Sequence, residues 1–417
     1  MPTDAEKLNL QAIALTGKGE LRTANALLKR ANALDPANAA LSCNLAISYT
    51  NLGDYDAASR LLLRLLTNEP NNLAVLHAYG VLSLVAAHPD DAARLFKRCY
   101  ELSPEVGNLK FDYSLALMQA GNWKDGLEAY ETRRENQPER AFDGLPRWQG
   151  ELDKTVYVWA EQGVGDTFQF ARYLPWLAER SKKVVFALPP DLHALFKPYN
   201  TVCELVSLTH NASGLDCETS LMSLARYHGT TPEHVPPDPG FIGYDIYPRD
   251  LPTTDKLKVG LCWACNPSSG HYRERSVPLE NLLQLAANPD LELYSLQVGA
   301  SAGDVSRLGA QLVVEDLSSE LSFDWRATAA AIKGVDVVVT TDTSVAHLAA
   351  ILRKPTYMFL ARRDWWRWGN EGQKTFWYPT MTIIRQKQPY SWASEVQQVS
   401  AILGQAAQAR CATRSAA

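Results

Sequence analysis

Two glycines and an aspartate stand close together in the segment EQGVGDTFQFARY (161–173). Gly163 and Gly165 allow the backbone to turn tightly and to approach a ligand, and Asp166 comes where a helix would begin. Asp166 is therefore either a functional carboxylate or a helix cap. Phe168 occupies the position of the third glycine of a dinucleotide-binding fingerprint, so that motif is excluded. The candidate ligand contacts around this turn are Gln162, Gly163, Gly165 and Thr167.

A second polar turn, TTDTSVAHLAA (340–350), follows the apolar run VDVVV. Its polar residues open a predicted helix, whose first N–H groups and positive dipole end can bind an anion. Hydroxyl groups at this helix start can bond phosphate oxygens. His347 lies one turn into the helix and either faces the ligand or packs in the core. The candidate binding residues of this turn are Asp342, Thr343, Ser344, Val345 and His347.

A third loop, CWACNPSSGHYRERSVPL (262–279), also comes at the end of an apolar run. An indole, an amide and two guanidinium groups offer stacking, hydrogen bonds and cations for a diphosphate. The candidate binding residues are Trp263, Asn266, Arg273 and Arg275, with Gln297 from the end of a later predicted strand. Cys262 and Cys265 form a C-x-x-C without a second pair, so we expect neither a metal site nor a redox site.

The segment ARRDWWRWGNEGQKTFWYP (361–379) is dense in aromatic and cationic side chains. Flat rings such as those of Trp377 and Tyr378 can stack on sugars or bases, and nearby cations can pair with an anionic substrate. The same rings are equally suited to packing between two lobes. The candidate polar contacts are Arg363, Asp364 and Arg367.

These loops belong to a region in which short β-branched runs alternate with amphipathic stretches. We expect strands that begin near residues 156, 184, 257, 291, 311, 335 and 355. Strands separated by helices predict parallel sheets covered on both faces. Because the alternation pauses at 237–256, we expect two Rossmann-like lobes, at 150–245 and 256–405, joined by a linker. Ligands bind where the strands of such sheets end, so all three loops should face a cleft between the lobes.

The first third of the chain repeats with a period of 34 residues. A 34-residue helix–turn–helix repeat needs a small residue where its helices cross, a large apolar residue one turn later and a helix stop. The small residues are Ala24, Ala58, Ala92 and Gly126, the large ones are Leu28, Leu62, Phe96 and Tyr130, and prolines stand at 36, 70 and 104. Gly19, Gly53 and Gly121 keep the same step at the turns, where Ala87 fills the missing place, and Gly80 marks another close approach.

Over residues 5–138 this pattern resembles the tetratricopeptide repeat family, with three full repeats and a degenerate fourth. The alternative is an ordinary helical bundle with coincidental spacing. The resemblance implies an α-helical repeat domain over 1–140, which would bind extended polypeptide or mediate self-association along a concave face.

Residues 150–405 resemble the heptosyltransferase-like glycosyltransferases, an inverting, metal-independent family with two Rossmann-like lobes of GT-B type. The similarity lies in EQGVGDTFQFARYLP and in VDVVVTTDTSVAHLAAILRKPTYMFL. It implies an acceptor-side first lobe with Asp166 as the catalytic base. It also implies a donor-side second lobe in which the 342–347 turn and the third loop hold the nucleotide diphosphate, with no cofactor.

One segment departs from that family's pattern. Heptosyltransferases have a lysine in the loop after the first strand of the second lobe, whereas this chain has HYRERS, with Arg273 and Arg275. Arginine can take the phosphate-binding role, but the donor sugar need not be a heptose. Repeats that precede a two-lobed transferase are similar to the architecture of protein O-GlcNAc transferase, although no catalytic segment of that enzyme is closely matched.

Composition limits the function further. The net charge of −5 is spread evenly along the chain, which makes a nucleic-acid partner less expected. No apolar run is long enough to span a bilayer, and the first residues lack the pattern of a secretory signal, so we expect a cytoplasmic protein. Seven scattered cysteines fit reduced thiols in that compartment.

The sequence therefore predicts a glycosyltransferase that moves a sugar from a nucleotide-diphosphate donor to a protein or glycan acceptor recruited partly by the repeats. The alternative is a non-catalytic scaffold, whose transferase-like half binds a nucleotide sugar or a partner.

Overall fold

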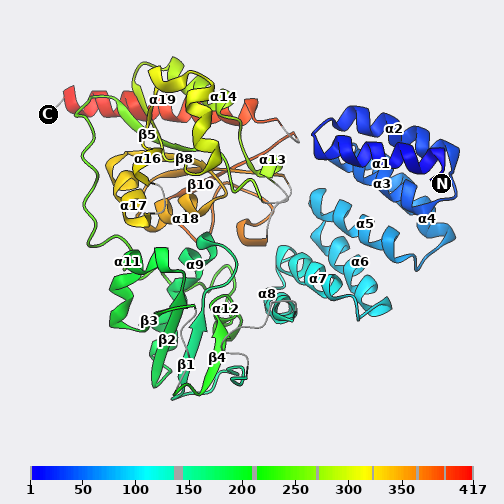
Figure 1. Ribbon diagram of the computed structural model, residues 1–417, viewed down its shortest axis with the longest axis horizontal. Helices are drawn as coiled ribbons and strands as arrows, with labels where there is room; N and C mark the ends of the chain where they lie inside the picture. Colours follow the sequence, from blue (N-terminus) through cyan, green and yellow to red (C-terminus); the bar gives the residue numbers. More distant parts are fainter. Residues whose placement is uncertain are drawn as a thin grey trace. The chain divides into compact units, whose positions relative to one another are not determined.

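The computed structural model describes residues 2–135, 144–208, 214–268, 272–321, 324–362, 366–388 and 391–415. The chain divides into two compact units, which Figure 1 shows in chain-order colours. The first unit comprises Met1–Gln137 together with Arg362–Glu371. The second comprises Pro138–Ala361 and Gly372–Ala417.

The first unit is built from consecutive helices of similar length. They are α1 (Asp4–Gly17), α2 (Leu21–Leu34), α3 (Ala39–Asn51), α4 (Tyr55–Asn68), α5 (Leu73–Val85), α6 (Pro89–Leu102), α7 (Gly107–Gln119) and α8 (Trp123–Tyr130), followed by the short helix η1 (Glu131–Arg134). Side chains of Asn38, Asp54, Asn72 and Asn122 accept backbone N–H groups at helix starts. The prolines at 36, 70 and 104 each follow the end of the second helix of a pair, as the period predicts.

Packing between these helices follows the predicted repeat. Ala24, Ala58 and Ala92 are fully buried. The large residues one turn later are almost fully buried. A Cβ placed on Gly80 would lie 2.6 Å from the Phe96 ring, so α5 and α6 touch because this residue has no side chain. The expected helical repeat is confirmed, including the close approach at Gly80.

The segment Arg362–Glu371 belongs to the first unit although it lies far along the chain. It contains the short helix η8 (Trp366–Trp368). The Trp366 ring lies 5.3 Å from that of Trp123 and 5.8 Å from that of Tyr130, centroid to centroid. Asn370 Nδ2 donates to the Gln119 carbonyl at 2.8 Å, and the Arg362 guanidinium lies 5.0 Å from the centroid of the Tyr55 ring.

The second unit begins with a parallel four-stranded sheet in the order β3-β2-β1-β4. Its strands are β1 (Thr155–Trp159), β2 (Lys183–Leu188), β3 (Glu204–Ser207) and β4 (Cys217–Ser220). In the register, Val156 stands opposite Val184 on one side and Cys217 on the other. The associated helices are α9 (Val164–Phe170), α10 (Leu174–Ala178), α11 (His193–Phe196) and α12 (Leu224–His228), with η2 (Ala171–Tyr173), η3 (Pro190–Leu192) and η4 (Lys197–Thr201).

A second parallel sheet has six strands in the order β10-β9-β8-β5-β6-β7. They are β5 (Leu257–Cys262), β6 (Leu291–Ser295), β7 (Val314–Asp316), β8 (Val337–Thr341), β9 (Thr356–Leu360) and β10 (Met381–Arg385). This is the doubly wound order of Rossmann folds. The helices are α13 (Tyr272–Arg275), α14 (Leu279–Leu282), α15 (Asp304–Arg307), α16 (Ser318–Leu321), α17 (Trp325–Gly334), α18 (Ser344–Ile351) and α19 (Ala393–Ser415), with η5 (Leu283–Ala287), η6 (Ala300–Gly303) and η7 (Ala310–Leu312).

Buried apolar residues lie on both faces of this sheet, as expected for parallel strands, with Val339 on one face and Val338 and Met358 on the other. Val259 and Val339 lie among residues from α14 and from α19, of which Val396, Val399 and Leu403 are fully buried. The predicted α/β region with two parallel sheets is thus present.

A long connection joins the two sheets. Between His228 and Leu257, where every residue is described, the chain forms no helix or strand apart from one isolated bridge. Lys333 of α17 donates to the carbonyls of Gly243 and Ile246, which fastens the connection to the second sheet's layer.

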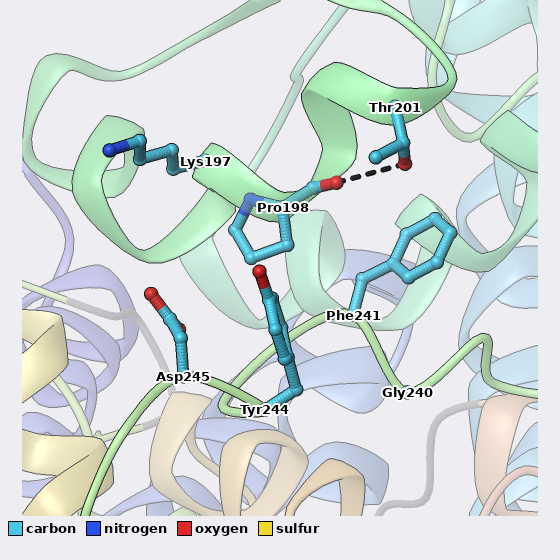
Figure 2. A pocket seen from close by; sticks show the side chains of 7 residues that line it. All are labelled: Lys197, Pro198, Thr201, Gly240, Phe241, Tyr244 and Asp245. Carbon is cyan, nitrogen blue, oxygen red and sulfur yellow. Dashed lines mark hydrogen bonds between the residues drawn. The ribbon is translucent and has the colours of Figure 1, made fainter.

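The connection and η4 together line a pocket of about 430 Å³ (Figure 2). Tyr244 is 74% exposed and lies below Pro198, while the Asp245 side chain accepts a hydrogen bond from Arg326 at 3.0 Å. None of the residues predicted for the site lines this pocket.

Candidate functional site

Strand order locates the edges at which each sheet can bind a ligand. The chain crosses from one side of β1 to the other between β3 and β4, and from one side of β5 to the other between β7 and β8. At such switch points, the loops that leave neighbouring strands diverge and leave room at the carboxyl ends of the strands. The loops after β1, β5 and β8 carry the three predicted motifs, so each motif lies at a switch point.

The glycine-aspartate turn after β1 leads into α9. Asp166 Oδ2 accepts the Gly163 N–H at 2.8 Å, so the carboxylate caps the helix. Asp166 is 8% exposed. The Thr167 hydroxyl points back to the Gly163 carbonyl at 3.5 Å, and Gln162 is an exposed residue with a left-handed φ of 58°. The capping role therefore exists in the structure, and it engages one of the two carboxylate oxygens.

The second motif forms the start of α18. Thr343 is the extended N-cap residue, and its hydroxyl lies 3.2 Å from that of Thr340 and 3.8 Å from the Cys262 sulfur. Burial raises the pKa of the Cys262 thiol to about 11, so this sulfur is a neutral packing group. Ser344 is half-buried and Val345 is buried.

The starts of α9 and α18 meet. A Cβ placed on Gly165 would lie 2.8 Å from His347 Cδ2, 3.3 Å from His347 Nε2 and 3.5 Å from the Ser344 Cα. Glycine is needed at 165 because any side chain would collide with the imidazole. The structure thus brings the 163–167 turn and the 342–347 turn together, which sequence alone placed only in the same general region.

The third loop contributes one ion pair at this edge. Arg275 Nη2 donates to the Asp342 carbonyl at 2.6 Å and to Asp342 Oδ2 at 3.1 Å. Asp342 is buried, so the guanidinium compensates its charge. Arg273 and Asn266 are exposed, and Asn266 Oδ1 accepts the Ser268 N–H at 3.0 Å.

Two predicted binding residues of the second sheet serve its interior instead. Trp263 is 1% exposed within the core, and its Nε1 donates to Asp304 Oδ2 at 3.1 Å, so no face of the indole is open to a ligand. Gln297 Oε1 accepts the N–H groups of Trp263 and Ala264, while Nε2 donates to the carbonyls of Ala264 and Val298. This amide holds the loop after β5 in place.

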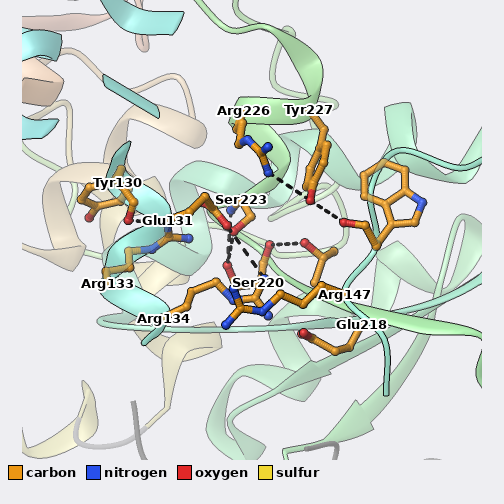
Figure 3. Close-up of polar contacts among 12 residues, drawn as sticks. Tyr130, Glu131, Arg133, Arg134, Arg147, Glu218, Ser220, Ser223, Arg226 and Tyr227 are labelled. Atoms are coloured by element: carbon orange, nitrogen blue, oxygen red, sulfur yellow. Dashed lines mark hydrogen bonds and ion pairs between the residues drawn. The ribbon is translucent and has the colours of Figure 1, made fainter. Parts of the chain in front are cut away.

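Polar residues also follow β4, the other strand at the first switch point. Figure 3 shows the Ser220 and Ser223 hydroxyls, which are 2.8 Å apart. Arg226 Nη1 donates to the Tyr227 hydroxyl at 3.2 Å, and that hydroxyl donates to the Trp148 carbonyl. The bond from Tyr227 to Trp148 connects this stretch to the segment that precedes β1.

The polar residues predicted in the aromatic segment are only partly within the described structure. Arg363 and Asp364 lie outside the described residues. Arg367 belongs to the first unit, where its guanidinium lies 5.5 Å from the centroid of the Trp366 ring. Trp377 and Tyr378 are buried in the second unit, in line with the packing interpretation of these rings.

Arg172 is the residue of this region that sequence reasoning missed. It is 3% exposed, and its Nε donates to the Gln169 carbonyl at 2.9 Å while Nη1 donates to the Trp377 carbonyl at 3.1 Å. The signal was present, since a single arginine stands among apolar residues in FARYLP. A cation in an otherwise buried helical stretch is unusual enough to call for an explanation.

Among the described residues, no cluster of His, Cys, Asp and Glu side chains has the geometry to hold a metal ion. Nor does any helix in the described ranges combine the length and hydropathy needed to cross a bilayer.

The chain is similar to several known proteins. Protein FlbA of Caulobacter vibrioides is 24% identical over 445 aligned positions, which cover 96% of this chain and 73% of that protein. The solved structure titled MamA MSR-1 is 26% identical over 32% of this chain and 76% of its own, with a TM-score of 0.27. MamA from Desulfovibrio magneticus RS-1 is 16% identical over 32% and 78%, with a TM-score of 0.29.

The family model of the tetratricopeptide repeat matches residues 15–80. This stretch coincides with the helix pairs whose small and large residues keep the 34-residue period. The N-terminal region of the chain therefore carries tetratricopeptide repeats.

Proposed function

We propose that this chain is an inverting, metal-independent glycosyltransferase that moves a sugar from a nucleotide-diphosphate donor to an acceptor recruited partly by its repeats. The observation that supports this most is the contact between the starts of α9 and α18. It brings the turn that carries Asp166 against a helix start suited to an anion, at 342–347. Transfer from a nucleotide-diphosphate sugar requires a proton acceptor for the acceptor hydroxyl and a site for the leaving diphosphate.

In this proposal Asp166 acts on the acceptor. As the acceptor oxygen attacks the anomeric carbon, its proton becomes acidic and passes to the carboxylate. The bond from the anomeric carbon to the phosphate oxygen breaks, and the nucleotide diphosphate leaves with its electron pair. Asp166 Oδ2 accepts the Gly163 N–H and so holds the carboxylate in one orientation.

The leaving diphosphate is proposed to lie at the start of α18. Negative charge builds there during transfer, and fixed N–H dipoles with the Ser344 hydroxyl stabilise it without reorganising. The charge of Arg275 is compensated by Asp342, so we propose that the exposed Arg273 supplies the positive field. The two sheets would then be the lobes of a GT-B enzyme, at 150–245 and 256–405, with the repeats at 1–140 as the acceptor-docking or assembly arm.

Replacement of Asp166 separates catalysis from capping. Asp166→Asn keeps an oxygen that can accept the Gly163 N–H, whereas Asp166→Ala removes it. We expect both variants to lose sugar transfer by roughly 10²–10⁴-fold. Only Asp166→Ala should also lose stability, by about 1 kcal/mol.

The assay would use purified full-length chain and a panel of UDP-, GDP-, ADP- and CMP-sugars, with donor consumption and thermal unfolding measured on the same samples. Transfer by Asp166→Asn at the wild-type rate would show that Asp166 is only a cap. If the wild type neither binds nor consumes any donor, the enzyme proposal is wrong.

A non-catalytic scaffold is the second candidate, and specific contacts favour it. Asp342 is neutralised by Arg275, Trp263 is buried in the core, and Gln297 has its amide bonded to backbone groups. A site whose polar groups are already bonded within the protein would bind a nucleotide sugar or a protein without reaction. Tight donor binding without turnover, unchanged in Asp166→Asn, would support the scaffold.

A further inference from the structure

Arg172 is a buried cation without a buried anion. Among the described residues no carboxylate lies within ion-pair distance of it, and its Nη2 has no hydrogen-bond partner. Burying a charge is costly unless other groups compensate it. The compensation here comes from carbonyls and aromatic rings.

Two rings of the second sheet's layer face this guanidinium. Its Cζ lies 5.4 Å from the centroid of the Trp377 ring and 5.1 Å from that of the Tyr378 ring. Both distances are within the range of about 6 Å at which a cation is attracted to an aromatic face. Together with the bond from Nη1 to the Trp377 carbonyl, these contacts hold residues 377–378 against the end of α9 and the start of η2.

Tyr378 in turn contacts His347. Its hydroxyl lies 2.9 Å from His347 Nδ1, and the two rings meet edge to face with centroids 5.7 Å apart. The opposite edge of the imidazole, with Cδ2 and Nε2, lies against Gly165 at the start of α9. One nitrogen therefore meets a phenol, and the other lies at the proposed site.

We propose that Arg172, acting through Tyr378, holds His347 in the tautomer that carries its proton on Nε2. A cation over the face of a phenol draws electron density from the ring and makes the hydroxyl a stronger donor. A neutral imidazole that accepts this hydrogen bond at Nδ1 keeps its single proton on Nε2. Arg172 and Tyr378 are then positioning residues.

The functional meaning of this arrangement rests on the proposed glycosyl transfer. An Nε2–H at the junction of α9 and α18 is a hydrogen-bond donor at the place where phosphate or sugar oxygens of the donor are proposed to lie. With the proton on Nδ1 instead, the same nitrogen would present a lone pair to those oxygens and repel them.

The test is a nitrogen-15 spectrum of the histidine side chains in the full-length chain, recorded without any sugar nucleotide. The chain has eight histidines, and His347→Gln assigns the relevant signals. In the wild type we expect Nδ1 of His347 to be unprotonated and Nε2 to be protonated. Tyr378→Phe and Arg172→Met should each turn this single tautomer into a mixture, visible as convergence of the two nitrogen shifts.

A matched control and a milder variant keep the test decisive. Tyr173→Phe removes another buried hydroxyl of the same segment, which pairs with Thr230 at 2.7 Å, and should leave the His347 signals unchanged. If Arg172→Met does not fold, Arg172→Lys, which keeps the charge but not the planar fork, should shift the signals in the same direction by less. A wild-type proton on Nδ1, or unchanged His347 shifts in folded Arg172 variants, would overturn the proposal.

Kinetics separate this proposal from the one on which it rests. With an active donor, Arg172→Met should lower kcat roughly ten- to hundredfold, as loss of a supporting contact commonly does, while KM changes little. If no donor is turned over, the transferase proposal fails, and the spectra still decide whether Arg172 sets the tautomer.

Discussion

Ala87 adopts a backbone conformation that three glycines adopt at equivalent places in the repeats. Its φ is 62°, and Gly19, Gly53 and Gly121, at steps of 34 residues, have φ of 81°, 79° and 86°. The left-handed region brings a Cβ too close to the following carbonyl, so alanine is strained there and glycine is not. The turn between α5 and α6 is thus formed despite its residue at 87.

Relief of this strain should stabilise the protein. We expect Ala87→Gly to raise the free energy of unfolding of the repeats by about 0.5–1 kcal/mol, because the native strain outweighs the added freedom of the unfolded chain. Urea unfolding followed by far-ultraviolet circular dichroism measures it. Ala86→Gly is the control, since Ala86 has a φ of −82° and should lose stability. A lower midpoint for Ala87→Gly would show that the turn is not strained.

At the scale of single residues, the sequence predicted positions better than roles. Asp166 and His347 could be located because each follows a recognisable strand, and strand ends define the edge of a parallel sheet. Other outcomes depend on contacts between residues far apart in sequence. They are the burial of Trp263, the hydrogen bonds of Gln297 to the backbone and the stacking of Arg172 on aromatic rings. Local residue patterns carry no information about such contacts.

Among the elements, the strands that the sequence predicted are those that contain a run of apolar residues, such as β1 and β8. β4 was not predicted because its residues, CETS, are polar and too few to show a period. All four are buried nonetheless, and the Glu218 carboxylate accepts the Trp159 Nε1–H at 2.7 Å. β3 was missed because it is short, and β10 because aromatic residues precede it. β7 is shorter than the predicted run because η7 takes the first residues of that run.

The packing of α5 on α6 provides a test at this scale. Gly80→Ala should cost about 1–3 kcal/mol of stability, because the new methyl group would overlap the Phe96 ring. Gly17→Ala is the matched control: nothing lies within 4 Å of its Cβ position, so it should be neutral or stabilising. Thermal unfolding of both variants measures the difference. Adding Phe96→Leu should restore part of the loss in Gly80→Ala but none in Gly17→Ala.

At the scale of the whole molecule, each of the two compact units is built from two separate parts of the chain. A segment between β9 and β10 supplies Trp366 to the repeats, where the ring is 2% exposed. Trp366→Ala should therefore destabilise the first unit by about 3–5 kcal/mol, as loss of a buried indole does. Hydrogen exchange should become faster in α8, which carries its ring partners Trp123 and Tyr130, and in α7, whose last residue accepts the bond from Asn370. Trp366→Phe should change it less. Unaltered protection of α7 and α8 would mean that this segment is no structural part of the repeats.

The same segment affects the order in which the protein can be completed during synthesis. The hydrogen bond from Asn370 to the Gln119 carbonyl spans 251 residues. At about 5–20 residues per second, the ribosome needs roughly 10–50 s to make the chain between these two residues. During that time α7 and α8 have emerged without the ring of Trp366, so the faces of Trp123 and Tyr130 stay uncovered on a nascent chain. We therefore expect chaperones to bind the nascent repeats first at these two aromatic residues.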